Sequence, residues 1–213
     1  MNPRTQSAGT CGIVAGIALA IAFLLFISSG ATPSTFADPA KALDFIGKNT
    51  SRLRLAIAFS LITIAFATVF LAGLAAKLRD KTPTRATAVL YLGVLGLVGH
   101  AVGSMLFGTS APLVAAYAAK DQVAASHAWV AVFAVDGAAD GLGNLFIGLS
   151  TLVAGWAITA EKALSPTLGW FGVIVGIVGV AAFLWPTDPL MMASFVAPII
   201  WLLWAGIALR QTK

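Results

Sequence analysis

A long apolar segment of this chain, residues 128–160, reads AWVAVFAVDGAADGLGNLFIGLSTLVAGWAITA. Its length and composition predict a membrane-spanning helix. The segment also contains Asp136, Asp140 and Asn144, and their spacing of four residues places all three on one face of a helix. A carboxylate at bilayer depth costs about 2.5–3.5 kcal/mol on insertion scales, so such side chains face other helices or a water-filled cavity. The segment therefore predicts a bundle in which other helices surround it.

The composition of the whole chain is that of a membrane protein. Hydrophobic residues make up 59% of the 213 residues, charged residues make up 10%, and the mean hydropathy is +0.94. A soluble domain has about 25% charged residues. The sequence therefore predicts an all-α fold, a single polytopic transmembrane bundle over residues 1–213 with no separate soluble domain. The net charge of +5 comes from scattered basic residues, which predicts the lipid bilayer as a partner and no nucleic acid.

Hydropathy predicts six spans, at approximately residues 10–28, 53–76, 86–107, 128–160, 167–185 and 190–209. We interpret the first span as a retained transmembrane helix rather than a secretory signal peptide, because its apolar stretch is long for a signal sequence. Two pairs of glycines spaced by four residues predict faces for close helix packing. These pairs are Gly12 with Gly16 and Gly172 with Gly176.

Six spans put both termini on the same side of the membrane, and the basic residues predict which side. One side would carry eight Lys and Arg residues: Arg4, Lys77, Arg79, Lys81, Arg85, Lys162, Arg210 and Lys213. The other would carry five: Lys41, Lys48, Arg52, Arg54 and Lys120. Cytoplasmic loops of membrane proteins are enriched in Lys and Arg, so the termini are predicted to be cytoplasmic.

The segments between and at the ends of the spans have their own signals. Residues 39–46 predict a short interfacial helix, and the Ala-rich part of 108–126 predicts a helix lying at the surface. Pro198 predicts a kink in the last span. Five tryptophans near span ends predict an interfacial aromatic belt. They are Trp156, Trp170, Trp185, Trp201 and Trp204.

The polar stripe of Asp136, Asp140 and Asn144 has two interpretations. As a functional site it would be a proton relay, a cation site or a contact for a polar ligand, with His100 of the third span as a further candidate member. Two carboxylates one turn apart repel when both are ionised, so at least one is expected to hold a proton. As a structural feature the stripe would join the helices by hydrogen bonds, with no ligand.

No motif for a metal, a cofactor or catalysis is present. His100 and His127 lie on different segments, and neither shows the spacing of a zinc or haem motif. There is no phosphate-binding glycine loop and no nucleophile elbow. We therefore predict no metal site, no cofactor implied by a motif and no enzymatic activity. Cys11 is the single cysteine and cannot form an internal disulfide.

Three passages carry a family resemblance. They are Arg52-Leu53-Arg54 before the second span, His127-Ala128-Trp129 at the start of the fourth, and LSPTLGWFG at residues 164–172 at the entry to the fifth. With the basic loop before the third span, this order of features resembles a bacterial family of six-helix membrane proteins that is known only as a domain of unknown function. The resemblance implies a six-helix bundle in the bacterial cell (inner) membrane as a multi-pass protein. It implies no activity.

Two functions from different classes follow. The first is a non-catalytic accessory or scaffold subunit of a membrane complex, favoured by the glycine-lined helix faces and the absence of a catalytic motif, with other membrane subunits or self-association as partners. The alternative is a small proton- or ion-coupled transporter that uses Asp136 and Asp140. The direction in which the acidic stripe points separates them: a cavity lined by Asp136, Asp140 and His100 supports transport, whereas a dry seam supports scaffolding.

Overall fold

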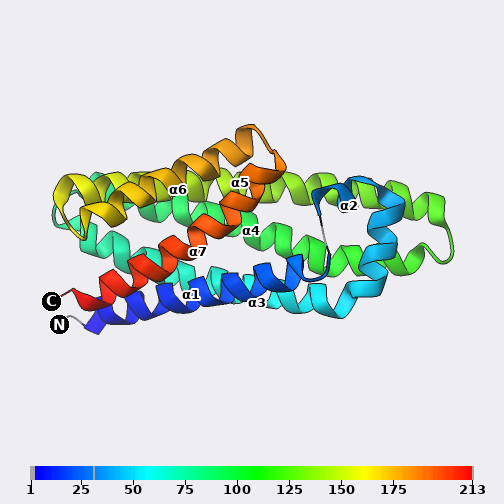
Figure 1. Cartoon of the computed structure of the whole chain (residues 1–213), viewed down its shortest axis with the longest axis horizontal. Coiled ribbons are helices and arrows are strands. Elements are labelled where there is room, and N and C mark those ends of the chain that lie inside the picture. The colour runs from blue at the N-terminus through cyan, green and yellow to red at the C-terminus, as the bar shows by residue number, and fades with distance from the viewer. Residues whose placement is uncertain (1–2, 31, 213) are drawn as a thin grey trace.

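The structure, a computed structural model, describes residues 3–30 and 32–212, except for the side chains of Arg4, Pro33 and Ser34. Arg4 and Lys213 were both counted above among the eight basic residues of the predicted cytoplasmic side. The side chain of Arg4 and the whole of Lys213 lie outside this description. The described residues form seven helices and no strand (Figure 1). The helices are α1 (Pro3–Ile27), α2 (Pro33–Ala37), α3 (Pro39–Arg79), α4 (Pro83–Tyr117), α5 (Gln122–Glu161), α6 (Pro166–Leu184) and α7 (Asp188–Gln211).

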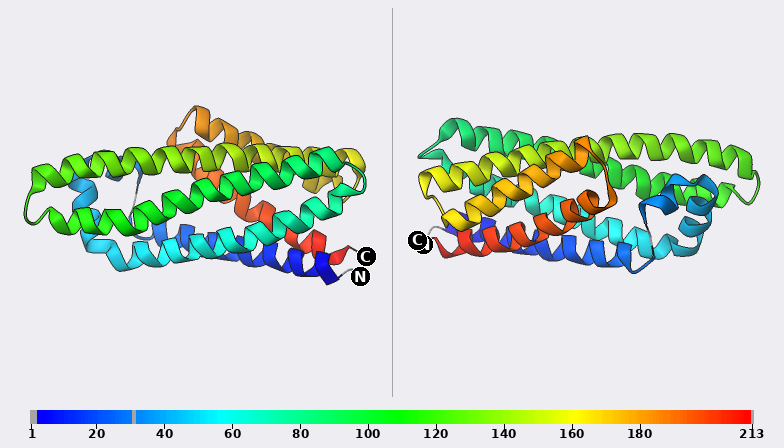
Figure 2. Two further views of the ribbon diagram at one scale, coloured as in Figure 1. Left: turned by 180° about the vertical axis from the view of Figure 1, so that it is seen from behind. Right: turned by 45° about the horizontal axis from the view of Figure 1, so that its top comes forward.

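The prediction of an all-α bundle with six spans is confirmed. Six of the helices, all except α2, are long and apolar enough to cross a membrane. They lie along one axis in an elongated bundle, and the two termini lie together at one end (Figures 1 and 2). Helices α4 and α5 make the most extensive contact of any pair, followed by α5 with α6 and α1 with α3. The helix that carries the acidic stripe is therefore central to the packing.

Three helices are longer than the predicted spans. Helices α3, α4 and α5 have 41, 35 and 40 residues, which at ~1.5 Å per residue is about 50–60 Å. The apolar core of a bilayer is only about 30 Å thick. The hairpin of α4 and α5 accordingly projects past α1, α6 and α7 at the end opposite the termini (Figure 1). Span limits drawn from hydropathy stop where the apolar residues stop, whereas these helices continue.

Both predicted surface helices belong to longer ones. Residues 39–46 begin α3, whose first part runs across the bundle before the helix turns along it (Figure 1). Asp38 caps this start by accepting from the backbone N–H groups of Ala40 and Lys41. The hydrogen bond from the Lys41 N–H lowers the pKa of the Asp38 carboxyl below its usual value. Residues 108–117 continue α4, so the connection to α5 is only residues 118–121.

A second apolar core holds this projecting end together. It contains residues of α2, the first part of α3, the end of α4 and the start of α5: Phe36, Ala42, Leu43, Ile46, Leu53, Ala111, Ala125 and Trp129. We call this group the cap cluster. Trp129 is 1% exposed, and its indole Nε1 donates to the carbonyl oxygen of Phe36 at 3.1 Å. The cap cluster thus fixes α2 against the beginning of α5.

The glycine pair of α1 lies at the contact with α7. A methyl carbon built on Gly12 would lie 2.6 Å from the Phe70 ring of α3 and 3.1 Å from the Gly206 Cα of α7. One built on Gly16 would lie 2.8 Å from Leu203 Cγ. Small residues at these positions allow the helices to approach closely.

The glycine pair of α6 lies at the contact with α5. A methyl carbon on Gly176 would lie 2.5 Å from the backbone nitrogen of Leu152, and one on Gly172 would lie 3.2 Å from the Gly155 Cα. The backbones of α5 and α6 are therefore in direct contact, which a side chain of any size would prevent.

We predict that Gly155→Ala destabilises the bundle. Its methyl carbon would lie 2.5 Å from both Gly169 O and Val173 N, which are backbone atoms and move only with α6. Overpacking of this kind costs about 1–3 kcal/mol. The control is Gly137→Ala, because nothing lies within 4 Å of that position. Unfolding in detergent, followed by circular dichroism, measures both variants, and equal stability of the two would contradict the α5–α6 contact.

Candidate polar site between α4 and α5

Glycines bring α4 and α5 close together at the level of the acidic stripe. A methyl carbon on Gly99 would lie 2.9 Å from Ala139 O and from Gly143 N, and one on Gly96 would lie 2.6 Å from Ile147 N. Without side chains at these positions the two backbones nearly touch. Polar side chains placed one turn away on either helix can then reach the partner helix.

His100 of α4 and Asp140 of α5 form the centre of the site. The distance between His100 Nδ1 and Asp140 Oδ1 is 3.2 Å, which is a hydrogen bond and becomes an ion pair when the imidazole is protonated. The side chains are 27% and 43% exposed, so the pair is sheltered but reachable.

Asp136 lies one turn away and is more deeply buried. It is 9% exposed, and its Oδ1 has no hydrogen-bond partner among the described residues. A methyl carbon on Gly103 of α4 would lie 2.6 Å from Asp140 Oδ1 and 3.2 Å from Asp136 Oδ1. Both carboxylates therefore converge on the same point of α4, and only a glycine leaves them room there.

A cavity of about 210 Å³ adjoins the pair. Asp140, Asn144, His100 and the neighbouring Ser104 contribute to its wall, whereas Asp136 is not among the lining residues. The wall also includes residues of α1, α3, α6 and α7. Of the four predicted site residues, three therefore meet at one cavity, and the fourth lies behind it against Gly103.

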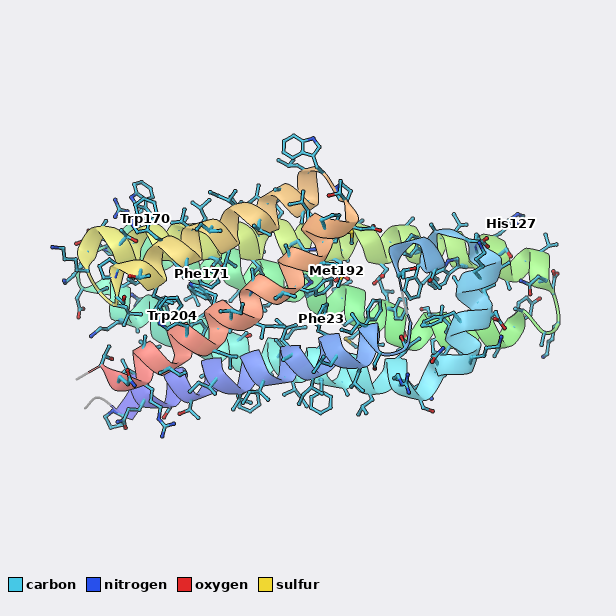
Figure 3. All side chains as sticks on the ribbon, viewed as in Figure 1. Phe23, His127, Trp170, Phe171, Met192 and Trp204 are labelled. Carbon is cyan, nitrogen blue, oxygen red and sulfur yellow. The ribbon has the colours of Figure 1, made fainter. Side chains whose placement is uncertain are left out.

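The site lies in the half of the membrane region away from the termini. Gly141, next to Asp140, faces the ring of Phe183, and α6 ends at Leu184. His127 is exposed and lies farther out, near the projecting end of the α4–α5 hairpin (Figure 3). It takes no part in the site. Among the described residues no group of three or more His, Cys, Asp or Glu side chains is placed to hold a metal ion.

Trp201 lines the cavity and was missed by the sequence analysis. Its predicted place in the interfacial belt is wrong, because it is 3% exposed and packs edge-on against Phe70 of α3. By contrast, Trp156 and Trp170 are 54% and 61% exposed, as a belt requires. The signal available in the sequence was Pro198, which is one turn before Trp201 and also lines the cavity.

Hydroxyl groups in the cavity wall were also missed. Ser150 Oγ donates to Val89 O at 2.7 Å, and Thr63 Oγ1 donates to Phe59 O at 3.0 Å. Both line the cavity. Serine and threonine occur throughout apolar helices, so hydropathy alone does not distinguish the ones that face a cavity.

One family model matches this chain. It is described as Domain of unknown function (DUF4386), and the match covers residues 14–207. The chain belongs to the DUF4386 family. The predicted resemblance to a six-helix family of unknown function is thereby confirmed, and every cavity-lining residue falls inside the matched region. No curated protein and no solved structure matches the chain. Membership of the DUF4386 family assigns no activity, so the function has to be inferred from the site.

We predict that trimethyloxonium, a small reagent that methylates ionised carboxylates, modifies Asp140 before Asp136. Asp140 lines the cavity and its side chain is 43% exposed, whereas Asp136 is 9% exposed. Peptide mass spectrometry after timed labelling in membranes gives the rate at each position. The Asp140→Asn variant serves as the control for assignment. Faster labelling of Asp136 would contradict the placement of Asp140 in the cavity wall.

Proposed function

We propose that the protein is a small membrane carrier in which the His100–Asp140 pair exchanges protons or cations with the cavity beside it. The observation that carries this proposal is the cavity of about 210 Å³ with His100, Asp140 and Asn144 in its wall. The sequence left the direction of the acidic stripe open. A stripe that faced only a dry helix seam would favour a scaffold, and a cavity lined by Asp136, Asp140 and His100 would favour transport. Two of these three residues, His100 and Asp140, line the cavity, which supports transport. The proposed activity is transport rather than catalysis.

The electrostatics of the cavity support a role in charge movement. A lone ion in a low-dielectric interior is costly, by several kcal/mol even after relaxation. His100 next to Asp140 reduces that cost whenever the imidazole is protonated, because the pair then has no net charge. When the proton leaves, the carboxylate needs another cation. The site is therefore built to change its occupant rather than to remain in one charge state.

We further propose that the end with the termini faces the cytoplasm of a bacterial inner membrane. At that end Lys81 Nζ donates to Glu161 O at 2.8 Å, and Arg85 lies 3.8 Å from the Glu161 carboxylate. The Arg85 guanidinium also lies 4.3 Å from the centroid of the Trp156 ring. Basic groups beside an exposed tryptophan are typical of the membrane–water boundary, and an excess of them is typical of the cytoplasmic side.

We predict that the purified protein makes liposomes permeable to protons or exchanges them for Na⁺ or K⁺. A trapped pH dye would report faster acidification than in empty liposomes under a valinomycin potential or an imposed cation gradient. Asp140→Asn should reduce the rate about tenfold or more, because the exchanging carboxylate is lost. Asp44→Asn is the matched control, since that side chain is 63% exposed on the first part of α3. Rates equal to empty liposomes under all gradients would contradict the proposal.

The orientation has its own test. Replacing the single cysteine by Cys11→Ser allows one new cysteine to be introduced at either end, as Arg79→Cys or Lys120→Cys, both at exposed positions. A membrane-impermeant maleimide should label the Lys120→Cys protein in intact cells with an opened outer membrane. It should label the Arg79→Cys protein only after the inner membrane is broken. The reverse pattern would place the termini outside.

The accessory or scaffold subunit remains the second candidate. Leu113, near the end of α4, and Val123, near the start of α5, are 70% and 67% exposed. These helix ends form the part of the α4–α5 hairpin that projects past α6 (Figure 1). Exposed apolar residues beyond the bilayer favour contact with another membrane subunit or a second copy. On this reading, Asp136→Asn and Asp140→Asn would alter assembly, seen as native mass in mild detergent, and would leave ion flux unchanged.

A further inference from the structure

The chemistry of the cavity wall restricts what the cavity can bind. Facing Asp140, the titratable groups are His100 from α4 and Asp136 from the same helix. The lining residues that α1, α3, α6 and α7 contribute are all uncharged. No lysine or arginine lines the cavity, so it offers an anion to its occupant and no permanent positive charge. An anionic solute would be repelled by the Asp140 carboxylate, whereas a cation would pair with it.

Away from Asp140 the wall is mostly apolar and contains aromatic rings. Leu19 of α1, Ile64 of α3 and Val175 of α6 line it, together with Phe195 and Trp201 of α7. Rings beside an anionic group favour an organic cation, because ring faces attract cations and ring bodies pack against apolar groups. An inorganic ion would leave this part of the cavity unfilled.

The hydroxyl groups deeper in the wall do not change this preference. The Ser150 hydroxyl donates its proton to Val89 O, and the Thr63 hydroxyl donates to Phe59 O. Neither has a proton left to offer an occupant. One further polar atom, the indole Nε1 of Trp201, has no partner among the described residues, but it lies against Gly172 of α6. The anionic partner in the wall is therefore Asp140, and the rings and aliphatic side chains of the remaining wall suit an apolar body.

We propose that the cavity binds a small hydrophobic amine in its ammonium form, with the nitrogen at Asp140 and the apolar body directed towards Trp201. This inference rests on the proposed function, because it names the substrate class of the same site. The ammonium replaces the imidazolium as the partner of the Asp140 carboxylate. When the imidazole of His100 carries a proton, binding of the amine releases that proton to water, so protons compete with the amine.

The test compares three compounds that share a phenyl ring on a short carbon chain and differ in the charge of the end group. They are phenethylamine, a cation, phenethyl alcohol, which is neutral, and phenylacetate, an anion. Binding to the full-length protein in detergent is measured by calorimetry between pH 6 and pH 8, over which phenethylamine stays charged. We expect phenethylamine to bind about ten- to a hundredfold more tightly than the alcohol, as a hydrogen bond to a charged group provides. Phenylacetate should show no binding. The affinity for the amine should rise with pH, and that for the alcohol should not.

Variants locate the site. Asp140→Asn should remove the preference for the amine over the alcohol, whereas Asp44→Asn should keep it. Val175→Phe places a larger side chain in the cavity and leaves His100 and Asp140 unchanged. It should weaken the binding of both the amine and the alcohol. If the Asp140→Asn protein misfolds, the Val175→Phe protein still tests the proposal, because it keeps Asp140. Equal binding of the amine and the alcohol, or binding of the amine unaffected by Val175→Phe, would overturn the proposal.

The amine-binding experiment and the proton-flux experiment test different proposals, and one can fail while the other succeeds. Flux that depends on Asp140, without preferential amine binding, overturns the amine inference and leaves the carrier proposal standing. Amine binding without proton flux above that of empty liposomes, even under an imposed gradient of phenethylamine, supports a binding site and overturns the carrier.

Discussion

The close approach of α4 to α5 is the constraint on which the rest of the structure depends. A carboxylate inside a bilayer requires a partner within hydrogen-bond reach. Asp140 has that partner only because α4 carries glycine at positions 96, 99 and 103, so that His100 comes within 3.2 Å of it. A larger residue at Gly103 would meet Asp140 directly. The same glycines that look like ordinary packing residues therefore determine the geometry of the polar site.

The contact of α5 with α6 serves a different purpose. There the backbones meet through Gly148, Gly155, Gly172 and Gly176, with no charged side chain between them. Helix α5 is thus held on both sides, by a dry seam with α6 and by the polar contact with α4. Helices α1, α3 and α7 then close around the remaining side. A space of about 210 Å³ is left where they meet α4, α5 and α6, with Pro198 of α7 in its wall.

The sequence predicted the number of spans and the family, because each depends on local properties: hydropathy and short motifs. It did not predict the continuity of α3, since Lys48 and Asn49 look like loop residues. In the structure they satisfy their polar groups within the helix, Lys48 by an ion pair with Asp44 and Asn49 by a bond to Phe45 O. The cavity could not be predicted, because its wall combines side chains from six helices. Trp201 shows the difficulty: hydropathy gives its position along the span, but whether it faces lipid depends on the packing of α7.

The charge balance of the cavity limits how it can work. With a proton on the imidazole, His100 and Asp140 together carry no net charge, and the rest of the wall is uncharged. A cation that entered while the imidazolium remained would leave one uncompensated positive charge in a low-dielectric space, at a cost of several kcal/mol. Loss of the proton without a replacement would leave an uncompensated carboxylate at a similar cost. Both costs disappear if the two events occur together. A single His–Asp pair in an otherwise uncharged cavity therefore favours one-for-one exchange of a proton and a cation over their joint movement in the same direction.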